Sequence, residues 1–184
     1  MEIKGTAVKS IPEFVKIKYP GEYAKWMKSL PPESQQIMNA LSSANWYPIT
    51  DGAITPTLKV GVLFFNGDTK KGAWELGRHS AEISLHGIYK IYVKFSSPSH
   101  IISRASRIIT AYYRPSQMEV VDRKANSVKL IMTKFDMPSE VIEHRIGGWI
   151  EKALEISGCN GVEVKISESL TKGSTKTVYD CSWA

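Results

Sequence analysis

Residues 118–133 read Met-Glu-Val-Val-Asp-Arg-Lys-Ala-Asn-Ser-Val-Lys-Leu-Ile-Met-Thr, two extended runs on either side of a Lys124-Ala-Asn126 turn. In the second run, Val128, Leu130 and Met132 alternate with Lys129, Ile131 and Thr133. A period of two places the apolar side chains on one face of a strand. The stretch therefore predicts an antiparallel hairpin with one buried face and one face in water.

A second pair of extended runs lies downstream, over 161–170 and 175–183, around a Lys172-Gly-Ser174 turn. If the chain turns at 172–173, Cys181 lies opposite about Val164 and several residues away from Cys159. Two cysteines are also too few for a disulfide framework. We therefore expect two reduced thiols.

A long helix is predicted between the two hairpins, from about Pro138 to Ser157. Gly147 and Gly148 lie inside this helix, where each glycine costs roughly 1 kcal/mol relative to alanine. Such a cost predicts close approach by a neighbouring element, a bulky ring or a ligand. The apolar stripe of the helix is suited to covering a sheet, and it consists of Ile142, Ile146, Trp149, Ile150 and Ala153.

The chain upstream of about residue 115 has mainly helical periodicity. The expected helices run over 11–19 (with Pro12 in the first turn), 22–30, 33–41, 56–65, 69–86 and, after a Ser96-Ser-Pro-Ser99 start signal, to Arg114-Pro115. Residues 2–8 and 88–95 fit either a helix or a strand. We therefore predict one α+β domain over 1–184, with a helical part over about 1–115. A four-stranded antiparallel part, in the order strand-strand-helix-strand-strand, follows over about 116–184.

The bulk composition is that of an ordinary globular protein, with 184 residues, 42% hydrophobic residues and a net charge of +6. No apolar run is long enough for a membrane span, and the start of the chain lacks the apolar core of a secretory signal. We therefore expect a cytoplasmic protein. Residues 86–134 hold nine Lys or Arg and two Asp or Glu, so an acidic partner could be attracted there.

The sequence lacks the common catalytic and phosphate-binding motifs, and we expect no enzyme. Arg104 and Arg107 form a basic stripe that could contact an acidic partner, whereas nucleic acid is disfavoured because no aromatic side chains interleave with it. His100, at the start of a helix, could stay neutral and ligate a metal. The spacing of Glu75, His79, Glu82 and His86 fits either a metal-binding helix face or simple helix-stabilising pairs.

Several short motifs resemble those of heme nitric-oxide/oxygen-binding (H-NOX) domains. They are Ile3-Lys-Gly-Thr-Ala-Val8, Gly72-Ala-Trp-Glu-Leu-Gly-Arg78, Ser97-Pro-Ser-His-Ile-Ile102 and Tyr113-Arg-Pro115. The order of the last four strands and the helix is similar too. The chain is most similar to heme-free bacterial relatives of this fold, on the basis of Trp46-Tyr-Pro48, Gly148-Trp149 and Trp183. Those relatives are related in architecture to four-vinyl-reductase-type domains and TRAPP small subunits.

The resemblance implies an H-NOX-like fold with a ligand cleft between its two parts, near Trp74, His100, Tyr112 and Pro115. H-NOX domains hold the heme propionates with a Tyr-x-Ser-x-Arg motif, whereas the corresponding stretch here is about Leu130-Ile-Met-Thr-Lys134. We therefore expect no heme and no other cofactor.

The expected function is that of a non-enzymatic sensory or adaptor module that binds a small apolar ligand or a signalling protein. One alternative is a gas sensor whose heme is ligated by His100. Another is an adaptor that uses Arg104 and Arg107. For each of the three functions, the sequence leaves open whether the protein is a homodimer.

Overall fold

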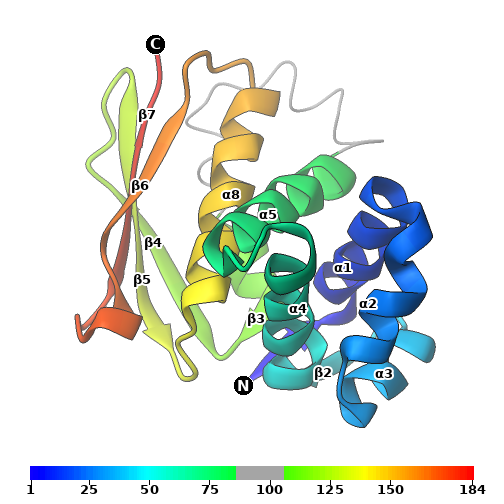
Figure 1. Cartoon of the computed structure of the whole chain (residues 1–184). Helices are drawn as coiled ribbons and strands as arrows, with labels where there is room; N and C mark the ends of the chain where they lie inside the picture. The colour runs from blue at the N-terminus through cyan, green and yellow to red at the C-terminus, as the bar shows by residue number, and fades with distance from the viewer. Residues whose placement is uncertain (86–105) are drawn as a thin grey trace.

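A four-stranded antiparallel sheet forms one side of the molecule, and the helices lie on its inner face (Figure 1). The computed structural model describes residues 1–85 and 106–184. The strands are β4 (Ser116–Val121), β5 (Ser127–Phe135), β6 (Glu163–Glu168) and β7 (Thr177–Ser182), in the spatial order β4-β5-β7-β6. This arrangement confirms the predicted α+β class and both predicted hairpins.

The pairing of β6 with β7 places Val164 directly opposite Cys181, as the turn position predicted. Cys159 and Cys181 are both buried and free. Burial raises the pKa of the Cys181 thiol to about 12, so this thiol stays protonated at neutral pH. The two cysteines therefore behave as small apolar core residues.

Helix α8 (Glu140–Ile156) lies between the sheet and helix α5 (Thr69–Leu85) (Figure 1). Each residue of its predicted apolar stripe is at most 5% exposed. Because α8 has neighbours on two sides, burial extends beyond that stripe to Glu143 and Arg145, both 2% exposed. The helix is the central element of the hydrophobic core.

Helices α5 and α8 touch at three glycines, two of them through backbone contacts. A Cβ atom on Gly77 would overlap the carbonyl oxygen of Arg145, and one on Gly148 would overlap that of Trp74. A Cβ on Gly147 would overlap the Trp74 ring. The glycines inside the long helix therefore serve close approach by a neighbouring helix and its indole ring, as their cost predicted.

Polar pairs follow the same seam between α5 and α8. Lys70 lies 2.8 Å from Glu140 near the two helix starts, and Lys152 lies 3.7 Å from Glu82 near their ends. The two helices therefore run side by side in the same direction. Exposed pairs of this kind contribute at most about 1 kcal/mol each, so the glycine contact dominates.

The helical part consists of short elements, most of which lie on the side of α5 that faces away from α8 (Figure 1). They are α1 (Gly5–Lys18), η1 (Pro20–Glu22), α2 (Tyr23–Ser29), α3 (Pro32–Asn39), η2 (Thr50–Ile54), α4 (Thr55–Phe64) and a helical stretch over 106–112. The predicted start of the first helix is wrong, because α1 begins at Gly5 and Pro12 lies in its interior. Burial of one face, with Val8, Ile11 and Val15 at 0% exposure, outweighs the backbone hydrogen bond that proline cannot make.

A small second sheet, which the sequence did not predict, joins the start of the chain to its middle. Its strands β1 (Glu2–Lys4), β2 (Trp46–Pro48) and β3 (Tyr113–Arg114) lie in the order β2-β1-β3. Ile3 lies opposite both Tyr47 and Tyr113 and is fully buried. Residues 2–8 are thus a strand followed by the first turn of a helix.

The predictions for 88–95 and for the helix start at 96–99 lie outside the described residues. Among the helices over 1–85 and 106–184, none combines the length and apolarity that crossing a bilayer requires.

Replacing Gly148 with alanine tests the helix contact. We expect Gly148→Ala to lower the free energy of unfolding by about 3 kcal/mol, because the added Cβ must push α5 and α8 apart. Gly21→Ala is the matched control, since no atom lies within 4 Å of a Cβ at Gly21, and its effect should stay within about 0.5 kcal/mol. Urea unfolding of both variants measures the difference, and equal stabilities would contradict the contact.

Candidate functional site

Two of the predicted cleft residues, Tyr112 and Trp74, line different cavities of the described residues. Tyr112 lines an interior cavity at the junction of α1, α8 and the start of β3. Trp74 instead lines a groove between α8 and β6, and Pro115 is exposed after a cis Arg114–Pro115 bond. Arg107 is exposed, whereas His100 and Arg104 lie outside the described residues.

The interior cavity beside Tyr112 is small, with a volume of about 10 Å³. Its wall includes Ala7, Ile109, Tyr113 and Trp149. A cavity of this volume has room for about one water molecule. Side chains of the described residues therefore leave little free volume around this cavity.

Arg145 is the polar side chain that fills this space. Its Nη2 donates to the carbonyl oxygen of Ala7 at 2.5 Å and to Oγ of Ser10 at 2.9 Å, both on α1. Its Nη1 is buried without a hydrogen-bond partner. Burial lowers the pKa of Arg145, yet a guanidinium remains charged at neutral pH. The sequence analysis missed this residue; the available signal was a charged residue directly beside Ile146 of the apolar stripe.

Trp74 belongs to a polar cluster that joins α5 to α8. Its Nε1 donates to Glu151 at 2.9 Å, and Arg78 pairs with the same carboxylate. Arg78 also makes two 2.9 Å hydrogen bonds to the Glu155 carboxylate, the bidentate geometry that favours arginine. With its ring against Gly147 and its N–H engaged, Trp74 is placed as a packing residue.

The groove beside Trp74 has a volume of about 250 Å³ and contains the buried carboxylate of Glu143. This carboxylate accepts hydrogen bonds from the hydroxyls of Ser169, Thr171 and Thr177. The three hydroxyls belong to the connection between β6 and β7 and to the start of β7. Glu143 therefore fastens α8 to the second hairpin, and its hydrogen-bonding capacity is used within the protein.

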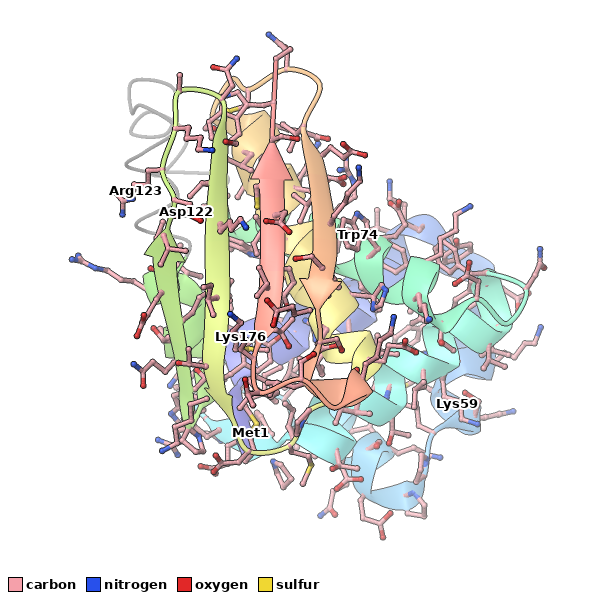
Figure 2. The ribbon with its side chains drawn as sticks, turned by 90° about the vertical axis from the view of Figure 1, so that its left-hand side faces the viewer. Met1, Lys59, Trp74, Asp122, Arg123 and Lys176 are labelled. Carbon is pink, nitrogen blue, oxygen red and sulfur yellow. The ribbon has the colours of Figure 1, made fainter. Side chains whose placement is uncertain are left out.

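The outer face of the sheet is polar, and charged side chains project from it toward the viewer in Figure 2. Lys129 lies 3.4 Å from Asp180 and 4.0 Å from Asp122, across three neighbouring strand segments. A shallow hollow of about 280 Å³ lies over this face. Alternating charges on an exposed sheet face are typical of a solvated surface.

The histidines described by the structure form no metal site. His79 is 7% exposed, and its ring packs edge-on against Phe14 at 5.4 Å. It therefore faces the core rather than a shared surface with Glu75 and Glu82. No group of three or more His, Cys, Asp and Glu side chains within 1–85 and 106–184 could hold a metal ion.

The fold has close counterparts among solved structures. The chain is similar to an unliganded Fe(II) H-NOX protein from K. algicida, with a TM-score of 0.74, 14% identity and coverage of 99% of this chain and 97% of that one. It is also similar to an H-NOX protein from S. oneidensis in the Fe(II)NO state, with a TM-score of 0.75, 10% identity and 99% coverage of both chains. An H-NOX from Shewanella woodyi, solved with IWP-051 bound in the Fe(II)CO state, gives a TM-score of 0.69, 11% identity and coverage of 98% and 94%.

The chain therefore has the H-NOX-like fold over nearly its whole length, as its motifs predicted. No protein-family model and no curated protein matches the sequence. At these identities the likeness establishes the fold alone.

The described part of the sheet carries no counterpart of the H-NOX propionate-binding side chains. In the stretch that corresponds to the propionate-binding motif, Leu130 and Met132 are core residues at 0% and 1% exposure, and Lys134 is exposed on the strand. Positions 130 and 132 of the sheet therefore offer no hydrogen-bond partner to a propionate group. The interior cavity beside Tyr112 is far too small for a porphyrin.

The pH dependence of stability tests the burial of His79. Burial lowers the pKa of its imidazole below the usual value of 6.5, mainly because the charged ring would lose its hydration. The unfolded chain therefore takes up this proton first as the pH falls below about 6.5, and stability is lost as the pH falls further toward the folded pKa.

We expect the free energy of unfolding of the unmodified chain to drop more steeply between about pH 7 and pH 5 than that of His79→Gln, which cannot titrate. Urea unfolding at a series of pH values measures both curves. Parallel curves would show that His79 is solvated in the folded state.

Proposed function

We propose that this chain is a non-enzymatic sensory or adaptor module that works without heme. The observation that carries the proposal is the guanidinium of Arg145 in the space where the helical part meets α8, hydrogen-bonded to Ala7 and Ser10. The remaining volume of about 10 Å³ leaves room for a very small ligand only. A large prosthetic group would have to displace this buried arginine together with its wall.

The absence of an anchor supports the same proposal. Two propionate groups need cationic or hydroxyl partners, and Arg provides them best because of its planar fork. The strand positions that would supply such partners carry Leu130 and Met132, whose apolar side chains lie in the core. Their burial contributes to the stability of the sheet instead.

The polar groups of the described residues support a non-catalytic role. The Glu143 carboxylate accepts from three hydroxyl donors. The Glu151 carboxylate accepts from Arg78 and Trp74, and the Glu155 carboxylate accepts from Arg78. Catalytic acids and bases need to reach a substrate, whereas these groups join elements of the fold. The chain would then act through binding, and fold alone does not decide the partner.

A protein partner is one form that this binding would take. The solved H-NOX proteins from S. oneidensis and Shewanella woodyi carry NO and CO on Fe(II), which makes them examples of the fold as a ligand-binding module. A heme-free version would keep the module but receive its signal differently. The exposed side chain of Arg107 stays available for the predicted contact with an acidic partner, whereas Arg104 lies outside the described residues.

Hemin titration distinguishes the proposal from its main alternative, the gas sensor ligated by His100. We expect the purified chain to develop no stoichiometric Soret band, because Arg145 occupies the interior beside α1 and the apolar side chains at 130 and 132 offer no partner for the propionates. The measurement is absorbance near 400 nm across the titration, with His100→Ala as the matched control. A one-to-one Soret band that disappears in His100→Ala would overturn the heme-free proposal in favour of the gas sensor.

A further inference from the structure

Arg145 is a buried positive charge without a carboxylate partner. It is 2% exposed, and its two hydrogen bonds go to neutral oxygens on α1, those of Ala7 and Ser10. No ion pair of the described residues includes it. Buried charges in proteins are normally paired, because removal from water is very unfavourable for an isolated ion.

The segment that the structure does not describe cannot supply the missing negative charge. Residues 86–105 contain no Asp and no Glu. The groups that act on the Arg145 pKa are Tyr113 and Tyr112 rather than a carboxylate. Tyr113 is no substitute, because burial raises the pKa of its phenol, which is therefore neutral. The counter-charge must come from outside the chain.

The cavity beside Arg145 has the donors that an anion requires. Nη1 of Arg145 and Nε1 of Trp149 are both buried without a partner, and both residues line the cavity. These two groups can only donate hydrogen bonds. An occupant that accepts from them and carries a negative charge would satisfy both and neutralise the guanidinium.

We propose that this cavity, between α1, α8 and the start of β3, binds one small inorganic monoanion of about the size of chloride. The volume of about 10 Å³ admits one atom-sized occupant and excludes carboxylic acids and phosphate esters. The inference rests on the proposed heme-free interior and names the ligand of that interior. An anion bound here links α1 to α8 through Arg145, so its occupancy affects how the two parts of the fold are joined.

Chloride-dependent stability tests the site. Urea unfolding would be measured at constant ionic strength while sodium gluconate, whose anion is too large for the cavity, is exchanged for sodium chloride. An anion that binds the folded state alone raises the folding equilibrium constant in proportion to its concentration once the site is saturated. We expect a slope of about one in the logarithm of that constant against the logarithm of chloride concentration. A slope of zero overturns the proposal.

Two variants assign the effect to Arg145. Arg145→Met removes the charge but keeps a long side chain, and its slope should fall to zero. Arg107→Met removes an exposed arginine from the same positively charged region and should keep the slope of the unmodified chain. An equal loss of slope in both variants would point to general screening and would overturn the assignment.

Crystals of the unmodified chain grown in bromide give a direct readout that does not depend on the variants folding. The proposal predicts an anomalous peak within hydrogen-bonding distance of Nη1 of Arg145. A water molecule there, with bromide only on the surface, would overturn it. If no bromide binds at Arg145 and hemin titration still gives no Soret band, the anion proposal fails and the heme-free function stands. Heme uptake together with no bromide at Arg145 would contradict both proposals.

Discussion

The rest of the structure depends on the contact between the backbones of α5 and α8. Gly77 on one helix and Gly148 on the other allow an approach that no residue with a Cβ would permit, and Gly147 makes room for the Trp74 ring. Because α8 also covers the sheet, this contact joins the helical part of the molecule to its strands (Figure 1). Arg78, Glu151 and Glu155 then hold the two helices in register along the seam.

The same contact determines what fills the interior. The carbonyl oxygen of Arg145 lies against Gly77, while the side chain of Arg145 reaches α1. A residue on the central helix thereby connects three elements that are far apart in sequence. Glu143, two residues earlier, connects the helix to the second hairpin in a comparable way, through the hydroxyls of Ser169 and Thr177. Hydrogen bonds on both sides of α8 therefore join it to α1 and to the second hairpin, and the proposal of a heme-free module starts from the buried position of Arg145.

The sequence predicted the parts of this fold that have a strong period. Alternation around Leu130 and Tyr179 indicated the hairpins, and the turn at 172–173 gave the Val164–Cys181 pairing. The small sheet was missed because strands of two or three residues show no period, and the early start of α1 was missed because Pro12 was read as a first-turn residue. Arg145 was missed because a charged residue in a single sequence is normally interpreted as exposed. Here it is buried, because α8 packs against other elements on two sides. Trp74 was predicted to lie near a ligand; its described contacts are with Gly147 and Glu151 of α8, and its role in ligand binding stays a prediction.

The central claim of the proposed function is that Arg145 fills the space between α1 and α8 and that the module works without heme. A crystal structure of the chain, expressed in cells supplied with a heme precursor, tests it most directly. The account predicts Arg145 inside the molecule, with Nη2 on the Ala7 carbonyl oxygen and the Gly77–Arg145 backbone contact intact. Density for a tetrapyrrole between the helical part and the sheet, with Arg145 turned out to solvent, would contradict it.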